Sequence, residues 1–354
     1  MSKFLSKKYI NLAPYTPGEQ PKNRKYVKLN TNESPFSPSK KALSLAKKAL
    51  KTLNLYCDPE FTNLKKVASI EFNVGEENLI FSNGSDEVLN YAFMAYCDDK
   101  TPAVFADITY GFYKVFAEVN NVPYETVPLK EDFSLDIKSL CEKKGTLFIA
   151  NPNAPTGIAL TLDEIEKILK SRKSRMVIID EAYIDFGGES AVSLIDKYDN
   201  LLVTQTFSKS RQMAGARLGI GFANSKVIDD LNRIRYSLNP YNVNATTQAL
   251  GIGSLQDKKY FEKTKTEIIE NREYLTNQLK SLGFTLTNSK ANFVFAKTDK
   301  ISGKYLYLSL KERGVLVRYF DKPRISDYNR ITVGNKQEIN KLLIEIKDIL
   351  ENIK

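Results

Sequence analysis

A lysine and an aspartate are the residues of this sequence best suited to covalent chemistry on a bound ligand. Asp180 ends the apolar run MVIID (176–180), and Lys209 follows the apolar run LLVTQ (201–205). A lysine amine can form a Schiff base with an aldehyde, and a buried carboxylate can keep a basic ring nitrogen protonated. The sequence contains no histidine, which excludes a Ser-His-Asp triad and any metal site built on histidine.

Residues that favour an anion follow several apolar runs of the same sequence. Backbone amides at the start of a helix bind phosphate, and hydroxyl and guanidinium groups can complete such a site. The residues of this kind are Gly84, Ser85, Thr206, Ser208 and Arg217. Tyr110 adds an aromatic face for a flat ligand. One cofactor combines a phosphate, a basic ring nitrogen and an aldehyde, namely pyridoxal 5′-phosphate (PLP), and we expect the chain to bind it.

The elements that must position these side chains are short apolar runs, typical of buried strands. Besides the two runs above, AVFAD (103–107) and TLFIA (146–150) are of this kind. Helical patterns separate several of them, and Thr161 with Glu164 forms a capping box at the start of one helix. Strands without alternation, separated by helices, indicate a mostly parallel sheet covered on both faces. In such sheets a ligand binds beyond the carboxyl ends of the strands, where the candidate residues stand.

The pattern changes after about residue 240. A helical stretch from roughly Asn244 to Leu282 precedes short strand candidates and a C-terminal helix from about Lys336, which is typical of a smaller α+β domain. The strand candidates are FTL (284–286), NFVFA (292–296), VLVRYF (315–320) and RITV (330–333). We therefore expect three parts: an N-terminal segment (1–38) belonging to the small domain and the dimer contact, a large PLP-binding domain (39–240), and a small C-terminal domain (241–354).

Composition narrows the class of protein. The 354 residues, 42% hydrophobic and 27% charged, are ordinary for a soluble globular protein. No apolar run approaches the roughly 18 residues of a membrane span, and three scattered cysteines indicate neither a disulfide framework nor a metal site. The net charge of +10 raises a nucleic-acid partner as an alternative, but 42 acidic residues are interspersed with 52 basic ones, which favours a solvated surface. We expect a cytoplasmic protein that binds no nucleic acid, membrane or metal.

The motifs together resemble the fold-type-I PLP-dependent aminotransferases and, within them, the histidinol-phosphate aminotransferase family. The supporting stretches span almost the whole chain in one order: LNTNESPFSPS (29–39), GSDE (84–87), TYGFY (109–113), NPNAPTG (151–157), DEAYIDF (180–186), TFSKSRQMAGARLG (206–219) and NRITVG (329–334). The resemblance implies the α/β fold of PLP-dependent transferases (type I), with a large domain on a mostly parallel sheet and a smaller α+β domain. It also implies a transaminase that moves an amino group between L-glutamate and a small phosphorylated keto substrate.

The resemblance assigns cofactor roles to matching positions. Lys209 would hold PLP covalently and then move a proton on the substrate, while Asp180 would pair with the ring nitrogen. Tyr183 would bond the ring oxygen, and Tyr110 would stack on the ring. The phosphate would be held by residues at two helix and strand ends: Gly84, Ser85, Asp86, Thr206, Ser208 and Arg217.

One position departs from the family pattern. Most members carry Asn immediately before PTG, where this chain has Ala154, so the ring oxygen would be left to Tyr183 and to a water or Asn153. Weaker stabilisation of that oxygen predicts a modest rise in the pKa of the linkage between cofactor and lysine, relative to members that have the Asn.

The resemblance also covers the substrate side and the partner subunit. Arg330 matches the arginine that clamps the substrate carboxylate or phosphate, and Arg318 is expected to assist it. Tyr15 and Asn32 lie on the N-terminal segment that lines the substrate side. Tyr56 matches a tyrosine that reaches the phosphate from the other subunit, which implies a homodimer with shared active sites.

Other functions stay open at this point. Relatives with the same cofactor residues decarboxylate phosphorylated amino acids, and others aminate different phosphorylated ketones, for example in surface-polysaccharide synthesis. A non-enzymatic binding protein that has kept the fold is a third hypothesis, against which the intact Lys209, Asp180 and Arg217 argue. Arg211, close to Lys209, either contacts a ligand or faces solvent.

Overall fold

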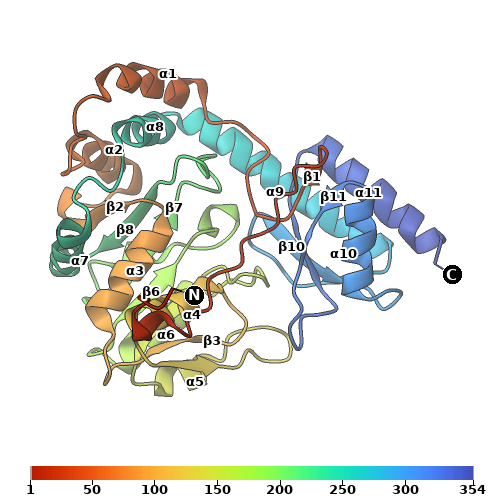
Figure 1. The fold of residues 1–354 in the computed structure, drawn as a ribbon, viewed down its shortest axis with the longest axis horizontal. Coiled ribbons are helices and arrows are strands. Elements are labelled where there is room, and N and C mark those ends of the chain that lie inside the picture. The colour runs from red at the N-terminus through yellow and green to blue at the C-terminus, as the bar shows by residue number, and fades with distance from the viewer. Residues whose placement is uncertain (1, 354) are drawn as a thin grey trace.

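The computed structural model describes residues 2–353 and contains a central sheet of seven strands (Figure 1). They are β2 (Leu79–Ser82), β3 (Ala103–Ala106), β4 (Tyr124–Val127), β5 (Thr146–Ala150), β6 (Val177–Asp180), β7 (Leu201–Thr206) and β8 (Gly219–Ala223). In space their order is β2-β8-β7-β6-β5-β3-β4. All neighbours from β7 to β4 pair in parallel, whereas β8 runs antiparallel to both β7 and β2. The expected mostly parallel sheet is confirmed.

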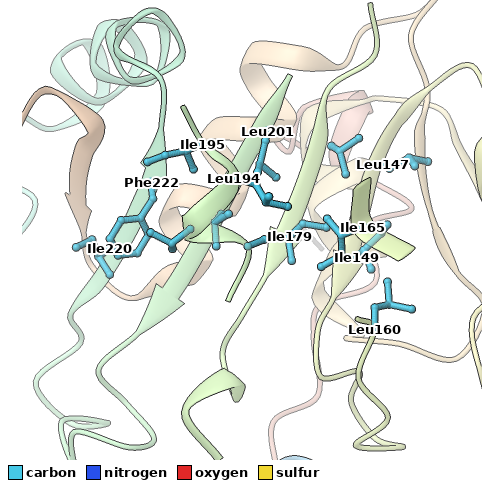
Figure 2. Close-up of a cluster of buried hydrophobic side chains, with 14 of the residues drawn as sticks. Leu147, Ile149, Leu160, Ile165, Ile179, Leu194, Ile195, Leu201, Ile220 and Phe222 are labelled. Atoms are coloured by element: carbon cyan, nitrogen blue, oxygen red, sulfur yellow. The ribbon is translucent and has the colours of Figure 1, made fainter. Parts of the chain in front are cut away.

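Helices cover both faces of this sheet, because successive residues of a strand point to opposite sides. Leu147 and Ile149 of β5 belong to the hydrophobic cluster on one face, shown in Figure 2, and Phe148 between them belongs to the cluster on the other face. The first face packs against α2 (Thr62–Phe72), α5 (Ile137–Glu142), α6 (Leu162–Ser171) and α8 (Ala245–Gln256). The second packs against α3 (Ser85–Tyr96), α4 (Phe112–Asn120) and α7 (Ser225–Leu238). The capping box of Thr161 and Glu164 is present at the start of α6.

A smaller antiparallel sheet forms in the C-terminal part of the chain. It contains β9 (Thr285–Leu286), β10 (Phe293–Lys297), β12 (Arg318–Tyr319) and β13 (Asn329–Thr332), in the order β12-β13-β10-β9. Helices α10 (Gly303–Glu312) and α11 (Lys336–Glu351) lie beside it, and α9 (Lys258–Ser281) connects it to the large sheet's side of the molecule (Figure 1). The helical stretch expected from residue 244 is two helices, α8 and α9, separated at Asp257, whose side chain caps α9. No helix among residues 2–353 is long and apolar enough to cross a membrane.

The N-terminal segment is held by the C-terminal part. Strand β1 (Val27–Lys28) pairs in parallel with β11 (Val315–Leu316), and Leu29 is buried in the C-terminal hydrophobic cluster. The run expected as one strand at 315–320 is therefore split, since β11 pairs with β1 and β12 with β13. Helix α1 (Lys40–Ala49) then packs against α8 on the large-sheet side. Residues between β1 and α1 thus pass from one sheet to the other.

A glycine allows β8 to support the turn between β2 and α3. The sequence pattern did not indicate this strand, because two of its five residues are glycines, which weaken strand propensity. A Cβ atom on Gly219 would lie 2.3 Å from the backbone nitrogen of Ser85 and 2.4 Å from the carbonyl carbon of Gly84. The strand can therefore approach the start of α3 only without a side chain at this point, and the approach fixes the position of Gly84 and Ser85.

Candidate active site

The carboxyl ends of β5, β6 and β7 face a cavity with two adjoining chambers. The inner chamber has a volume of about 260 Å³ and the outer chamber about 410 Å³. Five residues line both of them: Thr31, Tyr110, Ala154, Tyr183 and Lys209. The inner chamber is also lined by most of the residues expected to bind the cofactor, Ser85, Asp86, Asp180, Thr206, Ser208 and Arg217. Loops at neighbouring strand ends thus bring the distant sequence motifs together.

Lys209 stands where the two chambers meet. Its Nζ lies 3.4 Å from the backbone carbonyl oxygen of Thr31 and 5.8 Å from the centre of the Tyr183 ring. Burial lowers the pKa of Lys209 to about 8, and the positive charge of Arg330 acts in the same direction. An amine with this pKa is partly neutral near neutral pH, so Lys209 can act as a nucleophile and as a base.

Asp180 forms a charged end to the inner chamber and is held by Tyr113. The Tyr113 hydroxyl donates to Asp180 Oδ2 over 2.9 Å, and the Ala182 amide donates to Oδ1 over 3.3 Å. Burial raises the pKa of Asp180 to about 7, while the Tyr113 bond opposes the rise. Burial and the Asp180 charge hold the pKa of Tyr113 well above its usual range, so the phenol remains a donor.

Sequence analysis did not single out Tyr113. The signal was its spacing, three residues after Tyr110: Tyr113 lies in the first turn of α4, Tyr110 lies just before the helix, and the Tyr113 amide donates to the Tyr110 carbonyl at 3.2 Å. The two rings meet edge to face with centroids 5.6 Å apart. Tyr110 thus borders the chamber, and Tyr113 packs behind it and bonds the Asp180 carboxylate.

The other end of the inner chamber is built for an anion. Ser85 and Asp86 open α3, and the first amides of a helix have no helical carbonyl to bond. Gly84 has φ of +77°, and a Cβ atom there would lie 2.4 Å from Arg217 Nη2, so only glycine allows the guanidinium this close to the helix start. The Thr206 hydroxyl donates to Ser208 Oγ over 3.0 Å, which places both hydroxyls side by side.

Asp86 ties this anion end to the aromatic wall. One of its carboxylate oxygens accepts from the Tyr110 hydroxyl at 2.8 Å, and the other lies 3.2 Å from Arg217 Nη2. The Asp86 side chain therefore orients Tyr110 and Arg217, and its backbone amide remains available at the helix start.

Asn153 does not line either chamber. Its Nδ2 donates to the backbone carbonyl of Ile108 at 3.0 Å and to Thr156 Oγ1 at 3.1 Å, and its Oδ1 accepts from the Thr109 hydroxyl at 2.7 Å. The Asn153 side-chain amide therefore bonds within its own turn, to Thr156, and to the loop that contains Ile108 and Thr109. The structure does not bring it to the cofactor position that the sequence predicted.

Tyr183 has a different polar neighbour. Asn32 Nδ2 donates to the Tyr183 hydroxyl over 2.9 Å. On another side, Ala154 packs with Phe293 in an apolar cluster that Tyr183 joins. The structure therefore places Asn32 next to the phenol, and Asn32 also lines the outer chamber, on the substrate side where the sequence predicted it.

Two arginines from neighbouring strands line the outer chamber. Arg318 of β12 and Arg330 of β13 are direct cross-strand partners. Arg330 Nη2 donates to the Asn30 carbonyl at 3.1 Å, but its buried Nε has no partner and no acidic side chain among residues 2–353 forms a salt bridge with it. Arg318 is more exposed and bonds the carbonyls of Thr16 and Pro17 at 3.4 Å. Tyr15 also lines this chamber. A guanidinium without an acidic partner favours an anionic ligand.

Tyr56 and Arg211 lie outside both chambers. Tyr56 is 84% exposed on the surface, where its ring stacks on Tyr241 at 4.6 Å. Arg211 is buried, lies 4.0 Å from the centre of the Phe261 ring, and its Nη2 lies 3.1 Å from Glu71 Oε1. Arg211 therefore neither contacts the cavity nor faces solvent; it ties the Lys209 loop to α2 and α9.

Comparison with known proteins identifies the class of enzyme. The family model described as aminotransferase class I and II matches residues 24–346. The chain belongs to this aminotransferase family. A histidinol-phosphate aminotransferase from Clostridium botulinum is 44% identical to this chain over 354 residues, which cover 100% of both proteins. One from Brachyspira hyodysenteriae is 45% identical over 356 residues, 99% of this chain and 100% of the relative.

Solved structures confirm the fold of the aminotransferase. The crystal structure of the histidinol-phosphate aminotransferase from Clostridium acetobutylicum aligns with a TM-score of 0.85, at 24% identity, over 92% of this chain and 99% of that one. The enzyme from Sinorhizobium meliloti in complex with PLP aligns with a TM-score of 0.86, at 21% identity, over 94% and 93% of the two chains. The PLP-dependent type I fold expected from the sequence is confirmed.

The inner chamber of this aminotransferase fits PLP, the cofactor of the family. An amine (Lys209), a carboxylate (Asp180) and an anion end face one space, and these match an aldehyde, a ring nitrogen and a phosphate. Gly84 keeps the anion end open to Arg217, whose guanidinium uses only one nitrogen in side-chain bonds to described residues. The protein is therefore a PLP-dependent transaminase.

Proposed function

We propose that this aminotransferase moves an amino group between L-glutamate and a small phosphorylated ketone, and that the ketone is imidazole acetol phosphate, which becomes histidinol phosphate. The observation that carries the proposal is Arg330, a guanidinium facing the chamber beside Lys209 without an acidic partner among residues 2–353. Both proposed substrates are anions. The names and full-length similarity of the relatives support the choice of ketone.

The residues of the inner chamber divide the work. PLP, when bound, withdraws electrons from the substrate Cα and so allows its proton to leave. The neutral amine of Lys209, with its pKa lowered to about 8, would take this proton from Cα and deliver it to the cofactor carbon C4′, so that the amino group stays with the cofactor and the substrate leaves as a keto acid. Asp180 holds a proton on the ring nitrogen, and Tyr113 steadies Asp180. Ser85, Ser208 and Arg217 bind the phosphate by hydroxyls, amides and charge.

The outer chamber selects the substrate in this proposal. Arg330 binds the carboxylate of glutamate next to its Cα, because it shares the chamber with Lys209. Arg318, its cross-strand neighbour, and Lys322 supply positive charge for the second anionic group, the side-chain carboxylate or the phosphate. Tyr15, which stacks on Phe112 at 4.3 Å, forms an aromatic wall opposite.

We also propose a homodimer with shared active sites, as the exposed Tyr56 supports. Its ring reaches neither chamber of its own chain and stands in an exposed apolar region with Leu53, Leu55 and Tyr241. A second copy that covers this region could bring Tyr56 to the anion end of its neighbour. The three-part domain division (1–38, 39–240, 241–354) and a cytoplasmic location belong to the same proposal, and the free cysteines fit a reducing compartment.

The experiment is a half-reaction followed by an acceptor screen. PLP-loaded enzyme is incubated with L-glutamate alone, and 2-oxoglutarate is measured; one equivalent per active site is expected. Imidazole acetol phosphate and other phosphorylated ketones are then compared by kcat/KM, and imidazole acetol phosphate should lead by at least tenfold. Release of CO₂ from a phosphorylated amino acid, without formation of 2-oxoglutarate from glutamate, would refute the transfer reaction. A higher kcat/KM for another phosphorylated ketone would refute the substrate alone.

A further inference from the structure

The hydroxyl of Tyr183 has a single hydrogen-bond partner among residues 2–353, the side-chain amide of Asn32. The amide nitrogen donates to the phenol oxygen over 2.9 Å. The Tyr183 ring stands edge-on to Phe293, with centroids 5.1 Å apart, and Ala154 contributes only a methyl group to the same cluster. Asn32 is therefore the side chain that can set the direction of the Tyr183 hydroxyl hydrogen.

Thr332 of β13 fixes which end of the Asn32 amide faces the phenol. Thr332 Oγ1 accepts from the backbone amide of Asn32 at 2.9 Å and donates its own hydrogen to Asn32 Oδ1 at 3.1 Å. These are the hydroxyl's only partners among the described residues, and Thr332 is buried. With the amide reversed, the Thr332 hydrogen would face an NH₂ group and lose its acceptor, at a cost of about 1–3 kcal/mol. The orientation with Nδ2 toward Tyr183 is therefore favoured.

The backbone of Asn32 is fixed from the same side. Its φ is +55°, a left-handed conformation that asparagine tolerates better than most residues. Asn292 Nδ2 donates to the Asn32 carbonyl oxygen over 3.0 Å. Asn32 thus has its carbonyl, its amide and both ends of its side chain bonded, and it is 1% exposed. Of its side-chain groups, the oxygen and one Nδ2 hydrogen are bonded, and the second Nδ2 hydrogen has no partner among residues 2–353.

We propose that Asn32 is a positioning residue that acts through Tyr183: Thr332 fixes its amide so that the phenol accepts from Asn32 and directs its own hydrogen into the cofactor chamber. Tyr183 then presents a hydrogen-bond donor to that chamber. Asn32 is the only residue among those described that hydrogen-bonds the Tyr183 hydroxyl, and the methyl group of Ala154 forms no such bond. This role comes in addition to the substrate-side position that the sequence predicted for Asn32, which also lines the outer chamber. The proposal does not depend on which phosphorylated ketone is the substrate.

The charges around Tyr183 define what the test measures. Burial raises the pKa of the Tyr183 phenol, Arg330 and the Asn32 bond lower it, and Asp180 and Asp86 raise it. Lys209 faces the ring at 5.8 Å. Because Arg330, Asp180, Asp86 and Lys209 are unchanged in variants of Thr332, which also keep Asn32 neutral, a change in the pKa of Tyr183 in these variants reports the orientation of the Asn32 amide.

The experiment compares Thr332→Val, Thr332→Ser and Asn32→Asp in full-length protein labelled at tyrosine Cζ, before PLP is added. The Tyr183 resonance is assigned by its loss in Tyr183→Phe, and its pKa is read from an NMR titration. Thr332→Ser keeps the hydroxyl and should leave the pKa unchanged. Thr332→Val releases the amide, so Tyr183 can donate to its oxygen, and the pKa should rise by about one pH unit. Asn32→Asp offers only acceptors and adds a negative charge beside the phenol, so it should raise the pKa further and marks the upper limit of the effect.

A merely structural role for the pair would give a different result. Thr332→Val would then lower the melting temperature but leave the pKa of Tyr183 unchanged, and this outcome would overturn the proposal. If Asn32 acted only by binding substrate, Thr332→Val would raise the KM for glutamate and leave the pKa of Tyr183 unchanged, which would also overturn the proposal. If Asn32→Asp does not fold, the comparison of Thr332→Val with Thr332→Ser decides, because both retain Asn32.

Discussion

The hydroxyl of Tyr113 lies 2.9 Å from Asp180 Oδ2, and burial keeps this phenol protonated, so it donates its hydrogen to Asp180 whenever the carboxylate is ionised. Tyr113 is fully buried in the cluster on the α3, α4 and α7 face of the sheet and touches no substrate position. Its effect on the reaction must pass through Asp180. By stabilising the charged carboxylate it opposes the rise in pKa that burial imposes.

The change Tyr113→Phe should weaken PLP binding. Without the donor, the pKa of Asp180 rises further above about 7, so the carboxyl is more often protonated at neutral pH and pairs less well with the ring nitrogen. Loss of a hydrogen bond to a charged group costs roughly 1.5–3 kcal/mol, equivalent to about a 10- to 100-fold increase in the Kd of PLP. Fluorescence titration of the apoprotein with PLP measures this Kd.

Tyr91→Phe is the matched control for that change. Tyr91 is equally buried in the same cluster, and its hydroxyl has no hydrogen-bond partner among residues 2–353. This variant should bind PLP like the wild type. An equal loss of affinity in both variants would show that the effect comes from packing, not from the bond to Asp180.

The apoprotein of Asp180→Asn should be more stable than the wild-type apoprotein at about pH 8. The folded pKa of Asp180 is raised to about 7 from 3.8, so the stability linked to its neutral form is complete below about pH 4 and is lost as the pH rises through 7. A neutral asparagine suffers no such loss. We expect on the order of 2–4 kcal/mol in favour of the variant at pH 8 and a smaller difference at about pH 5.

Urea denaturation of both apoproteins at the two pH values measures this difference. The pKa of Glu181 is also raised to about 7 by burial, but Glu181 is present in both proteins and its contribution cancels. A difference that does not change between pH 5 and pH 8 would mean that Asp180 is not desolvated as described.

The chemistry of the site was predictable from the sequence where residues follow recognisable strands. The runs at 146–150, 176–180 and 201–205 are strands of the parallel sheet, and their carboxyl ends place Lys209 and Asp180 at one cavity. A parallel sheet covered by helices on both faces leaves its strand ends as the open edge. The pattern of apolar runs was therefore enough to predict that Lys209 and Asp180 lie at the same cavity.

Side-chain partners could not be predicted in the same way. Asn153 stands in the expected turn, yet its amide bonds Ile108 and Thr156 instead of facing the cavity. Asn32 contacts Thr332, 300 residues away, through a segment held by the two-residue strand β1. Local periodicity carries no information on such contacts, because they arise only when two distant elements pack.

Arg211→Met should destabilise the protein without affecting the cofactor site. The Arg211 side chain is 5% exposed and Glu71 is 12% exposed, so the change leaves a mostly buried carboxylate with only the exposed Lys258 as partner. Breaking a buried ion pair costs about 3–5 kcal/mol, and Lys258 reduces this to about 2–3. Urea denaturation measures the loss, and the Kd of PLP should not change. A normal stability with a weakened PLP affinity would assign Arg211 to the ligand after all.

Arg330→Met should impair recognition of L-glutamate while PLP still binds. The Arg330 side chain lines the outer chamber but not the inner one, and its buried Nε has no partner among the described residues. A paired, charge-assisted contact to a carboxylate is worth roughly 2–4 kcal/mol, so kcat/KM for glutamate should fall by about 30- to 1,000-fold.

Arg318→Met is the control on the neighbouring strand. Arg318 is more exposed and already bonds two carbonyl oxygens, so its loss should cost about tenfold or less. If the two variants lose the same activity, or if Arg330→Met releases PLP, the carboxylate site lies elsewhere in the cavity.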